Sequence, residues 1–136
     1  LDDEQVSDFH SYKILVINRT NTIYRNNKQI INPKSKIRAK KQYHLDHIYS
    51  IKQGFKHKLP LSIITHPCNL HMIHYKENLI KQDQSWITLE ELLKKIIQYE
   101  TKIEVKQIHL QEEYNHVKQY ASLLLEKFNR GYHDVT

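Results

Sequence analysis

The segment at residues 43–81 constrains the fold of this chain most, because it alternates short extended runs with a long connection. Residues 43–49 (YHLDHIY) and 69–73 (NLHMI) each have the length and composition of a short β-strand. The connection at residues 50–68 contains Gly54, Pro60 and Pro67, and loops of this length within a compact domain are often functional. Residues 75–81 have the pattern of a short helix. The segment therefore predicts strand, loop, strand and helix.

The flanking segments predict different structures on the two sides. Residues 12–18 (YKILVIN) are β-rich, turn residues follow at 18–21, and residues 22–25 resume a β-type pattern, so we expect an N-terminal hairpin. Thr88 and Glu91 form a capping box, which predicts that a helix begins there. We expect this helix to break at residues 101–102, and a second helix to run from about residue 104 to residue 128, with Gly131 as its C-cap.

Apolar stripes support both C-terminal helices. The predicted fold class is α+β, with an N-terminal hairpin and basic linker at residues 1–42, a central module at 43–87 and a helical region at 88–136. We expect the helical region to form one compact domain with the module. The stripes consist of Leu89, Leu92, Leu93, Ile96 and Ile97 in the first helix, and of Ile108, Val117, Tyr120, Ala121, Leu124 and Phe128 in the second.

Composition excludes several classes of protein. The chain has 136 residues, a formal charge of +6 and two glycines, and it contains no glycine-rich phosphate loop. Its single cysteine, Cys68, excludes an internal disulfide and a paired-cysteine zinc ribbon. Residues 1–8 are acidic and polar, unlike a secretory signal, and no apolar run is long enough to span a membrane. We therefore expect a cytoplasmic protein with no membrane partner, and the positive charge favours nucleic acid.

A basic linker precedes the central module. Residues 34–41 (KSKIRAKK) hold five basic side chains in eight residues. One interpretation is a solvated loop that keeps the domain soluble. The other is an arm that contacts phosphates, which its position before the first central strand favours. The five side chains are Lys34, Lys36, Arg38, Lys40 and Lys41.

Adjacent Asp46 and His47 are the first candidates for chemistry. Hydrolysis of a phosphodiester needs a base for water, and a neutral imidazole suits that task near pH 7. It also needs neutralisation of the transition state and of the leaving oxygen, which a hard divalent cation on oxygen ligands supplies. His47 is thus a candidate general base and Asp46 a candidate Mg²⁺ ligand. Adjacent strand residues point to opposite faces, so a shared site requires the strand to end or bend there.

Two asparagines strengthen the prediction. Asn78, on the predicted short helix, offers a neutral oxygen ligand, whereas Asn69 at the start of the second strand can hold the long loop through backbone hydrogen bonds. The set Asp46-His47, Asn69 and Asn78 resembles the HNH family of ββα-metal endonucleases, and most closely the free-standing HNH endonucleases of bacteriophages, many of them homing enzymes. The resemblance covers about residues 43–93.

The resemblance implies a role for each residue. His47 would polarise the attacking water, Asp46 and Asn78 would hold Mg²⁺ or Mn²⁺, and Asn69 would orient the loop and the catalytic histidine. The substrate would be DNA, most simply double-stranded, and a phage-encoded protein would act in the host cytoplasm. The paired zinc-binding cysteines of many family members are missing here, and the long C-terminal helices would replace that support.

Other interpretations stay open. Lys81, one helical turn after Asn78, is either a phosphate contact or a solvated lysine. His44 could assist the metal or serve as a hydrogen-bonding partner. A zinc site would need His66, His71 and His74 to converge with other ligands. Whole-chain alternatives are a catalytically inactive DNA-binding module, a structural or assembly protein that uses its C-terminal helices, and a nuclease directed at RNA. Neither the target site nor the oligomeric state follows from the sequence.

Overall fold

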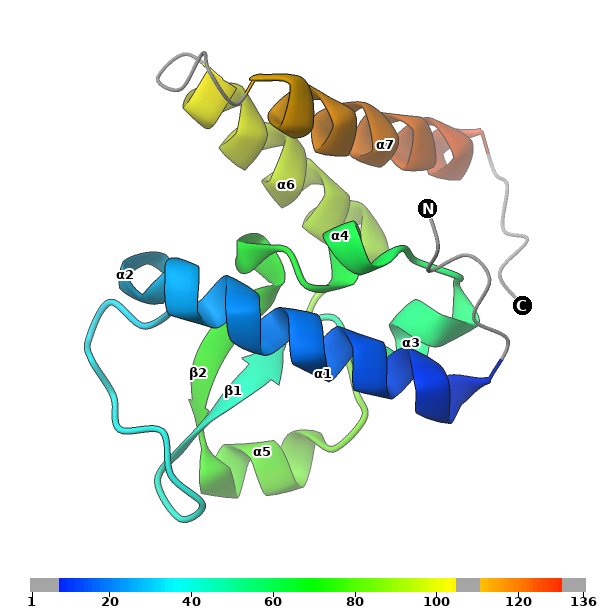
Figure 1. The fold of residues 1–136 in the computed structure, drawn as a ribbon. Helices are drawn as coiled ribbons and strands as arrows, with labels where there is room; N and C mark the ends of the chain where they lie inside the picture. The colour runs from blue at the N-terminus through cyan, green and yellow to red at the C-terminus, as the bar shows by residue number, and fades with distance from the viewer. Residues whose placement is uncertain (1–7, 105–110, 131–136) are drawn as a thin grey trace. The chain divides into compact units, whose positions relative to one another are not determined.

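The computed structural model describes residues 8–104 and 111–130 (Figure 1). The chain divides into two compact units, residues 1–86 and residues 87–136. The first unit contains most of the helices and the only two strands among the described residues. It is a mixed α and β structure that is mostly helical. In the second unit, all the described secondary-structure elements are helices.

The first element is a helix, so the predicted N-terminal hairpin is wrong. Helix α1 covers Phe9–Asn26 and includes both runs assigned to strands. Asp8 caps it by accepting a hydrogen bond from the Ser11 amide at 2.8 Å. Its buried side chains recur every four residues, which is the spacing of one helical face, and packing of that face outweighs the β-propensity of the YKILVIN run. These side chains are Tyr12, Val16, Thr20 and Tyr24.

Two antiparallel strands and a helix form the centre of the first unit (Figure 1). Strand β1 is Tyr43–His47, strand β2 is Leu70–His74, and helix α5 follows directly at Tyr75–Lys81. The register pairs Asp46 with His71 and His47 with Leu70. The predictions of two short strands and a short helix are confirmed, with bounds shifted by one or two residues in the strands.

The long connection between the strands is folded rather than open. It contains helices α3 (Ile51–Lys56) and α4 (Leu61–Ile64) and the short 3-10 helix η2 (Pro67–Asn69). Ser50 caps α3 by accepting from the Gln53 amide, and Pro60 precedes α4. Gly54 lies where a Cβ would approach Ile64 Cδ1 to 2.8 Å. A larger residue here would therefore force the buried Ile64 side chain to shift.

Helix α1 is fixed to this connection by polar contacts. The Tyr12 hydroxyl donates to the Leu59 carbonyl at 2.8 Å, and Arg19 Nε donates to Thr65 Oγ1 at 3.1 Å. Phe55 lies against the Tyr12 ring, with centroids 5.5 Å apart. Further along, Tyr24 forms a small apolar cluster with Ile31 of the short helix α2 (Lys28–Ile31) and with Leu70. Helix α1 thus spans both the connection and one face of the hairpin.

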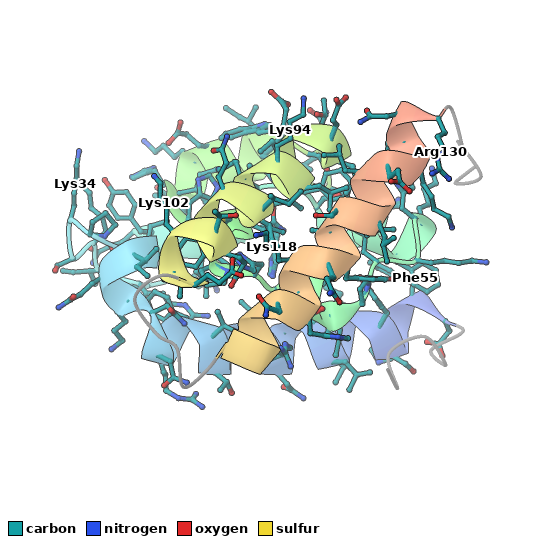
Figure 2. The ribbon with its side chains drawn as sticks, turned by 90° about the horizontal axis from the view of Figure 1, so that it is seen from above. Lys34, Phe55, Lys94, Lys102, Lys118 and Arg130 are labelled. Atoms are coloured by element: carbon teal, nitrogen blue, oxygen red, sulfur yellow. The ribbon has the colours of Figure 1, made fainter. Side chains whose placement is uncertain are left out.

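The second unit consists of helices α6 (Leu89–Glu104) and α7 (Gln111–Asn129). The predicted capping box is confirmed, since the Thr88 amide donates to Glu91 Oε1 at 2.9 Å and the Glu91 amide to Thr88 Oγ1 at 3.1 Å. Lys118 of α7 is labelled in Figure 2. Its ammonium forms an ion pair with Glu104 of α6 at 3.1 Å, which joins the two helices. Helix α6 continues through residues 101–102, so the break predicted there is wrong.

The apolar stripes agree with the described part of these helices. Leu92, Leu93 and Ile96 are fully buried, as is Ala121 on α7. Ile108 and Gly131 lie outside the described residues. Among the described helices, none combines the length and the apolar character that crossing a membrane requires.

Candidate functional site

The two faces of the hairpin carry different chemistry, because side chains alternate along each strand. Asp46 points toward α5, where it meets Lys81, while His47 points toward α1, where it meets Thr20. The adjacent Asp and His of the sequence motif are therefore separated by the sheet in this structure. Residues directly opposite in an antiparallel pair share a face, so His71 joins Asp46 on the α5 side.

A cluster of polar side chains surrounds the carboxylate of Asp46. Oδ2 lies 2.7 Å from His71 Nε2, and Oδ1 accepts a hydrogen bond from Lys81 Nζ at 3.3 Å. Lys81 Nζ also donates to the His47 carbonyl at 2.9 Å and lies 5.9 Å from the centre of the Trp86 ring. We call Asp46, His71, Lys81 and Trp86 the Asp46 cluster.

Burial differs sharply within the Asp46 cluster. Lys81 is 1% exposed and Asp46 is 9% exposed, so their charges are largely removed from water. The His71 side chain keeps 30% of its surface, and Trp86 keeps 47%. A buried carboxylate is stable only when it is paired and hydrogen-bonded, and Lys81 and His71 meet that need. The cluster thus has a charged base and a solvent-accessible rim.

Asn78 reaches the same face one helical turn before Lys81. Its Nδ2 donates to His44 Nδ1 at 3.0 Å, and His44 Nε2 donates in turn to the Lys40 carbonyl at 2.7 Å. This pattern assigns the proton of the His44 ring to Nε2, because Nδ1 accepts. The amide oxygen of Asn78 is not used in the contact with His44. The structure therefore places Asp46 and Asn78 on the same face of the hairpin, with Asn78 against His44 and Asp46 against Lys81.

The ring of His47 is buried on the opposite side. Its Nε2 lies 2.8 Å from Thr20 Oγ1, and the residue is 8% exposed. Burial lowers the pKa of His47 to about 4. The negative charge of Asp46 opposes this shift, and Lys81 and His71 add to it. His47 is accordingly a neutral imidazole near pH 7, which is the form that a general base needs, but Thr20 holds it away from the Asp46 cluster.

Asn69 performs the loop-holding task expected of it. Its Oδ1 accepts from the Tyr49 amide at 2.7 Å, and its Nδ2 donates to the carbonyls of Tyr49 and Ile64 at 3.1 and 2.9 Å. The side chain is completely buried. It fixes the end of β1 to the end of α4. The Tyr49 hydroxyl continues this network to His57 Nδ1 at 2.8 Å, and burial raises the pKa of Tyr49 to about 12.

The basic segment at residues 34–41 lies next to β1 and the start of α5, and backbone hydrogen bonds hold it in place. The Tyr43 amide donates to the Ile37 carbonyl and the Ala39 amide to the Tyr43 carbonyl, both at 3.2 Å. The Tyr75 amide at the start of α5 donates to the Gln42 carbonyl at 2.8 Å. All five predicted phosphate-contacting side chains are exposed: Lys34, Lys36, Arg38, Lys40 and Lys41. The segment is thus an ordered basic surface next to the α5 face of the hairpin.

Lys81 fits neither a phosphate contact nor a solvated lysine, the two interpretations that the sequence left open. The lysine is neither solvated nor on the surface, because its ammonium is buried against Asp46 and the His47 carbonyl. No sequence pattern predicted the contact between His71 and Asp46 or the contact between Thr20 and His47. Both depend on the register of the hairpin and on the docking of α1, which no local pattern encodes. In the described part of the chain, no group of three or more His, Cys, Asp and Glu side chains is placed to hold a metal ion.

The donor set still suits one class of metal. Asp46 offers a carboxylate and Asn78 an amide oxygen, and both are the hard oxygen ligands that Mg²⁺ and Mn²⁺ prefer. Mg²⁺ in particular is held by one or two protein oxygens together with water and phosphate. Within the described residues, the histidines near the motif do not converge on a zinc site, and two of them cap helices, His66 through the Cys68 amide and His74 through the Lys76 amide.

Comparison with known proteins adds no family to this picture. No protein-family model, no curated protein and no solved structure matches the chain significantly.

Proposed function

We propose that this protein is a metal-dependent endonuclease of the HNH type, which hydrolyses phosphodiester bonds in DNA. One observation carries the proposal. The carboxylate of Asp46 on β1 and the amide of Asn78 on α5 lie on the same side of an antiparallel hairpin, directly beside an ordered basic segment. This arrangement suits a cation shared between the protein and a phosphate group.

Asp46 and Asn78 are the residues that would hold Mg²⁺ or Mn²⁺. The bound cation would withdraw charge from the phosphate and stabilise the leaving 3′ oxygen. Lys81 forms an ion pair with the Asp46 carboxylate and orients it in the buried base of the cluster. Asn69 holds β1 and the long connection in register, so that Asp46 stays at its place beneath α5.

A base must take a proton from the attacking water as its oxygen bonds to phosphorus and the bond to the 3′ oxygen breaks. His47 is the base that the HNH resemblance implies. For this role its ring must leave Thr20, and the end of β1 must bend so that the side chain reaches the Asp46 side of the sheet. His71 is a rival on the correct face, because its ring is partly exposed and Asp46 orients it at 2.7 Å. A carboxylate that orients a histidine is a common arrangement in general-base catalysis.

The basic segment would track the DNA backbone. Exposed lysines and arginines contact phosphates without regard to sequence, which positions the substrate rather than selecting it. Lys40 is joined through its carbonyl to His44, which in turn contacts Asn78. Substrate held along the segment would therefore lie close to the proposed metal ligands.

The test is cleavage of supercoiled plasmid DNA with Mg²⁺, with Mn²⁺ and with EDTA. Wild-type protein should cleave only when a divalent metal is present. Asp46→Asn should lower the rate by about a hundredfold or more, since it removes a charged ligand at a cost of roughly 3 kcal/mol in the transition state. Cleavage that persists in EDTA, or unchanged in Asp46→Asn, would contradict the proposal.

Two further variants identify the base. His47→Ala and His71→Ala should be compared in the same assay, with folding checked by circular dichroism. Loss of about two to four powers of ten in rate is expected for whichever residue transfers the proton. If His47→Ala cleaves like the wild type, the assignment of His47 is wrong and His71 replaces it.

A second candidate function is a non-catalytic DNA-binding module on the same fold. The contact between Lys81 and Asp46 favours it, because an internal ammonium group already neutralises the carboxylate. In that case the protein should bind DNA with strong salt dependence and cleave nothing with any divalent metal.

A further inference from the structure

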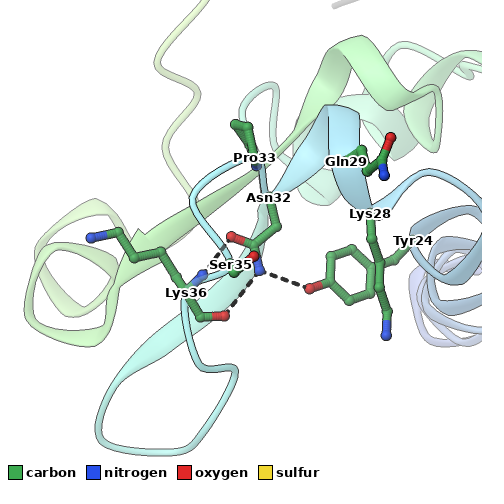
Figure 3. Close-up of a pocket in the computed structure, with 7 residues that line it drawn as sticks. All are labelled: Tyr24, Lys28, Gln29, Asn32, Pro33, Ser35 and Lys36. Atoms are coloured by element: carbon green, nitrogen blue, oxygen red, sulfur yellow. Dashed lines mark hydrogen bonds between the residues drawn. The ribbon is translucent and has the colours of Figure 1, made fainter.

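A polar hollow lies in the first unit, between α2 and the loop that leads into the basic segment (Figure 3). Its volume is about 660 Å³, which is within the range of small-molecule sites. Lys28 lines it from the helix, and Ser35 and Lys36 line it from the loop. It is separate from the Asp46 cluster and shares no residue with it.

The wall of the hollow is a fixed structure. Asn32 lies at its centre, where Nδ2 donates to the Tyr24 hydroxyl at 3.0 Å and to the Lys36 carbonyl at 2.9 Å (Figure 3). Oδ1 of the same amide accepts from the Lys36 backbone amide at 2.8 Å. Ser35 adopts a positive φ of 50°, a conformation that costs a non-glycine residue about 1 kcal/mol or more. The network around Asn32 holds the loop in this conformation, so the hollow is preformed.

The charge of the hollow is strongly positive and uncompensated. Among the described residues, neither Lys28 nor Lys36 has a carboxylate partner; each instead lies over a tyrosine ring, at 5.9 Å from Tyr24 and 4.9 Å from Tyr43. Arg38 lies 5.4 Å from the Tyr24 ring and donates to the Asn21 amide oxygen at 3.0 Å.

The surrounding sequence reinforces this charge. Residues 9–45 contain nine lysines and arginines and no aspartate or glutamate, so all fifteen acidic residues of the chain lie elsewhere. Lys34, on the loop of the hollow, projects outward from the ribbon (Figure 2). An anionic ligand that enters here meets no repulsive carboxylate in this stretch, and ammonium groups with a nearby hydroxyl are typical partners of phosphate oxygens.

We propose that this hollow binds one phosphorylated nucleotide unit of a nucleic-acid strand. Lys28 would contact the phosphate of this unit, and Ser35 would donate a hydrogen bond to one of its oxygens. Lys36, whose ammonium points away from Lys28 (Figure 3), would contact an adjoining phosphate of the strand. The volume exceeds that of a phosphate group and leaves room for the attached sugar and base. That the ligand is a nucleic-acid strand rests on the proposed nuclease function. In that function the hollow would hold the substrate at a distance from the bond that is cleaved.

The experiment measures binding without cleavage. A fluorescently labelled single-stranded oligonucleotide with a 5′ phosphate is titrated with the full chain in EDTA, and dTMP and thymidine are used as competitors. Lys28→Gln/Lys36→Gln is compared with Lys52→Gln/Lys56→Gln, which removes the same charge from exposed positions on α3. Thermal melting checks that both variants fold.

The expected result is specific to the hollow. Lys28→Gln/Lys36→Gln should weaken binding about tenfold or more and lower the slope of log affinity against log salt by about 1.4, the loss of two single-strand phosphate contacts. The control variant should change affinity less than about threefold, and dTMP but not thymidine should compete. Equal losses in the two variants, or competition by thymidine equal to that by dTMP, would overturn the proposal.

Binding and cleavage assays together distinguish failure of the hollow proposal from failure of the nuclease proposal. If the strand binds in the hollow but plasmid is never cleaved, only the nuclease assignment falls. If plasmid is cleaved and Lys28→Gln/Lys36→Gln binds and cleaves like the control, only the hollow assignment falls.

Discussion

The imidazole Nε2 of His47 lies 2.8 Å from Thr20 Oγ1, and this contact joins β1 to α1 across 27 residues of sequence. It fixes the ring on the α1 side of the hairpin, while the neighbouring Asp46 carboxylate is held on the α5 side by Lys81 and His71. Two adjacent residues of the chain thus belong to different environments. The contribution of these contacts to the free energy of unfolding can be measured without knowing the substrate.

Thr20→Val tests the contact between α1 and β1. The substitution preserves shape but leaves the buried His47 nitrogen without its partner, which should lower the free energy of unfolding by about 1–3 kcal/mol. Urea denaturation near pH 7 measures the change. Thr22→Val, at an exposed position on the same helix, serves as the control and should alter stability by less than about 1 kcal/mol. Equal effects at the two positions would contradict a specific role for Thr20.

Stability should fall as the pH is lowered from about 6.5 to about 4. The pKa of His47 is about 4 in the folded chain, and an unperturbed histidine has a pKa near 6.5, so between these values the unfolded chain binds the extra proton. The contribution is complete above about pH 6.5 and declines by up to about 3 kcal/mol as the pH reaches 4.

Urea denaturation at several pH values, for the wild type and for His47→Gln, isolates this effect. The glutamine keeps a polar group for Thr20 but does not titrate, so its stability should depend less steeply on pH in this range. Identical pH profiles for the two proteins would show that His47 is not the group responsible.

Lys81→Met should be among the most destabilising single changes in the first unit. It leaves the Asp46 carboxylate buried with only His71 as a side-chain partner, and breaking a buried ion pair in this way typically costs about 3–5 kcal/mol. The double variant Asp46→Asn/Lys81→Met removes both charges. It should recover part of the loss, which a double-mutant cycle from guanidinium denaturation would quantify. Strictly additive losses would mean that the two charges do not interact.

Asn69→Ala should destabilise the connection between the strands. The substitution leaves the Tyr49 amide and two carbonyls without their buried partner, a loss of about 3 kcal/mol or more. Hydrogen exchange should report faster exchange at the Tyr49 amide, and denaturation should report the global change. Asn78→Ala, whose side chain makes one contact with His44 in this structure, should cost much less. Comparable losses for the two asparagines would argue against the central role of Asn69.

Part of the structure follows from local sequence. The Thr88 and Glu91 capping box, the two short strands and helix α5 were all predictable, because each depends on residues close together in the chain. The loop-holding role of Asn69 was also anticipated, and its three hydrogen bonds agree with it. The N-terminal helix was not anticipated, although Asp8 as a cap and the four-residue spacing of Tyr12 and Val16 were signals of it.

The sequence by itself determined which side chains could carry chemistry, since Asp46, His47, Asn69 and Asn78 are fixed by their identities and spacing. Only the tertiary structure determined how they are distributed. The hairpin register places His71 beside Asp46, and the docking of α1 draws His47 to Thr20. The position of α5 buries Lys81 against the carboxylate. These contacts join residues 25–35 positions apart, and their geometry arises from packing of apolar faces and pairing of buried charges rather than from local preference.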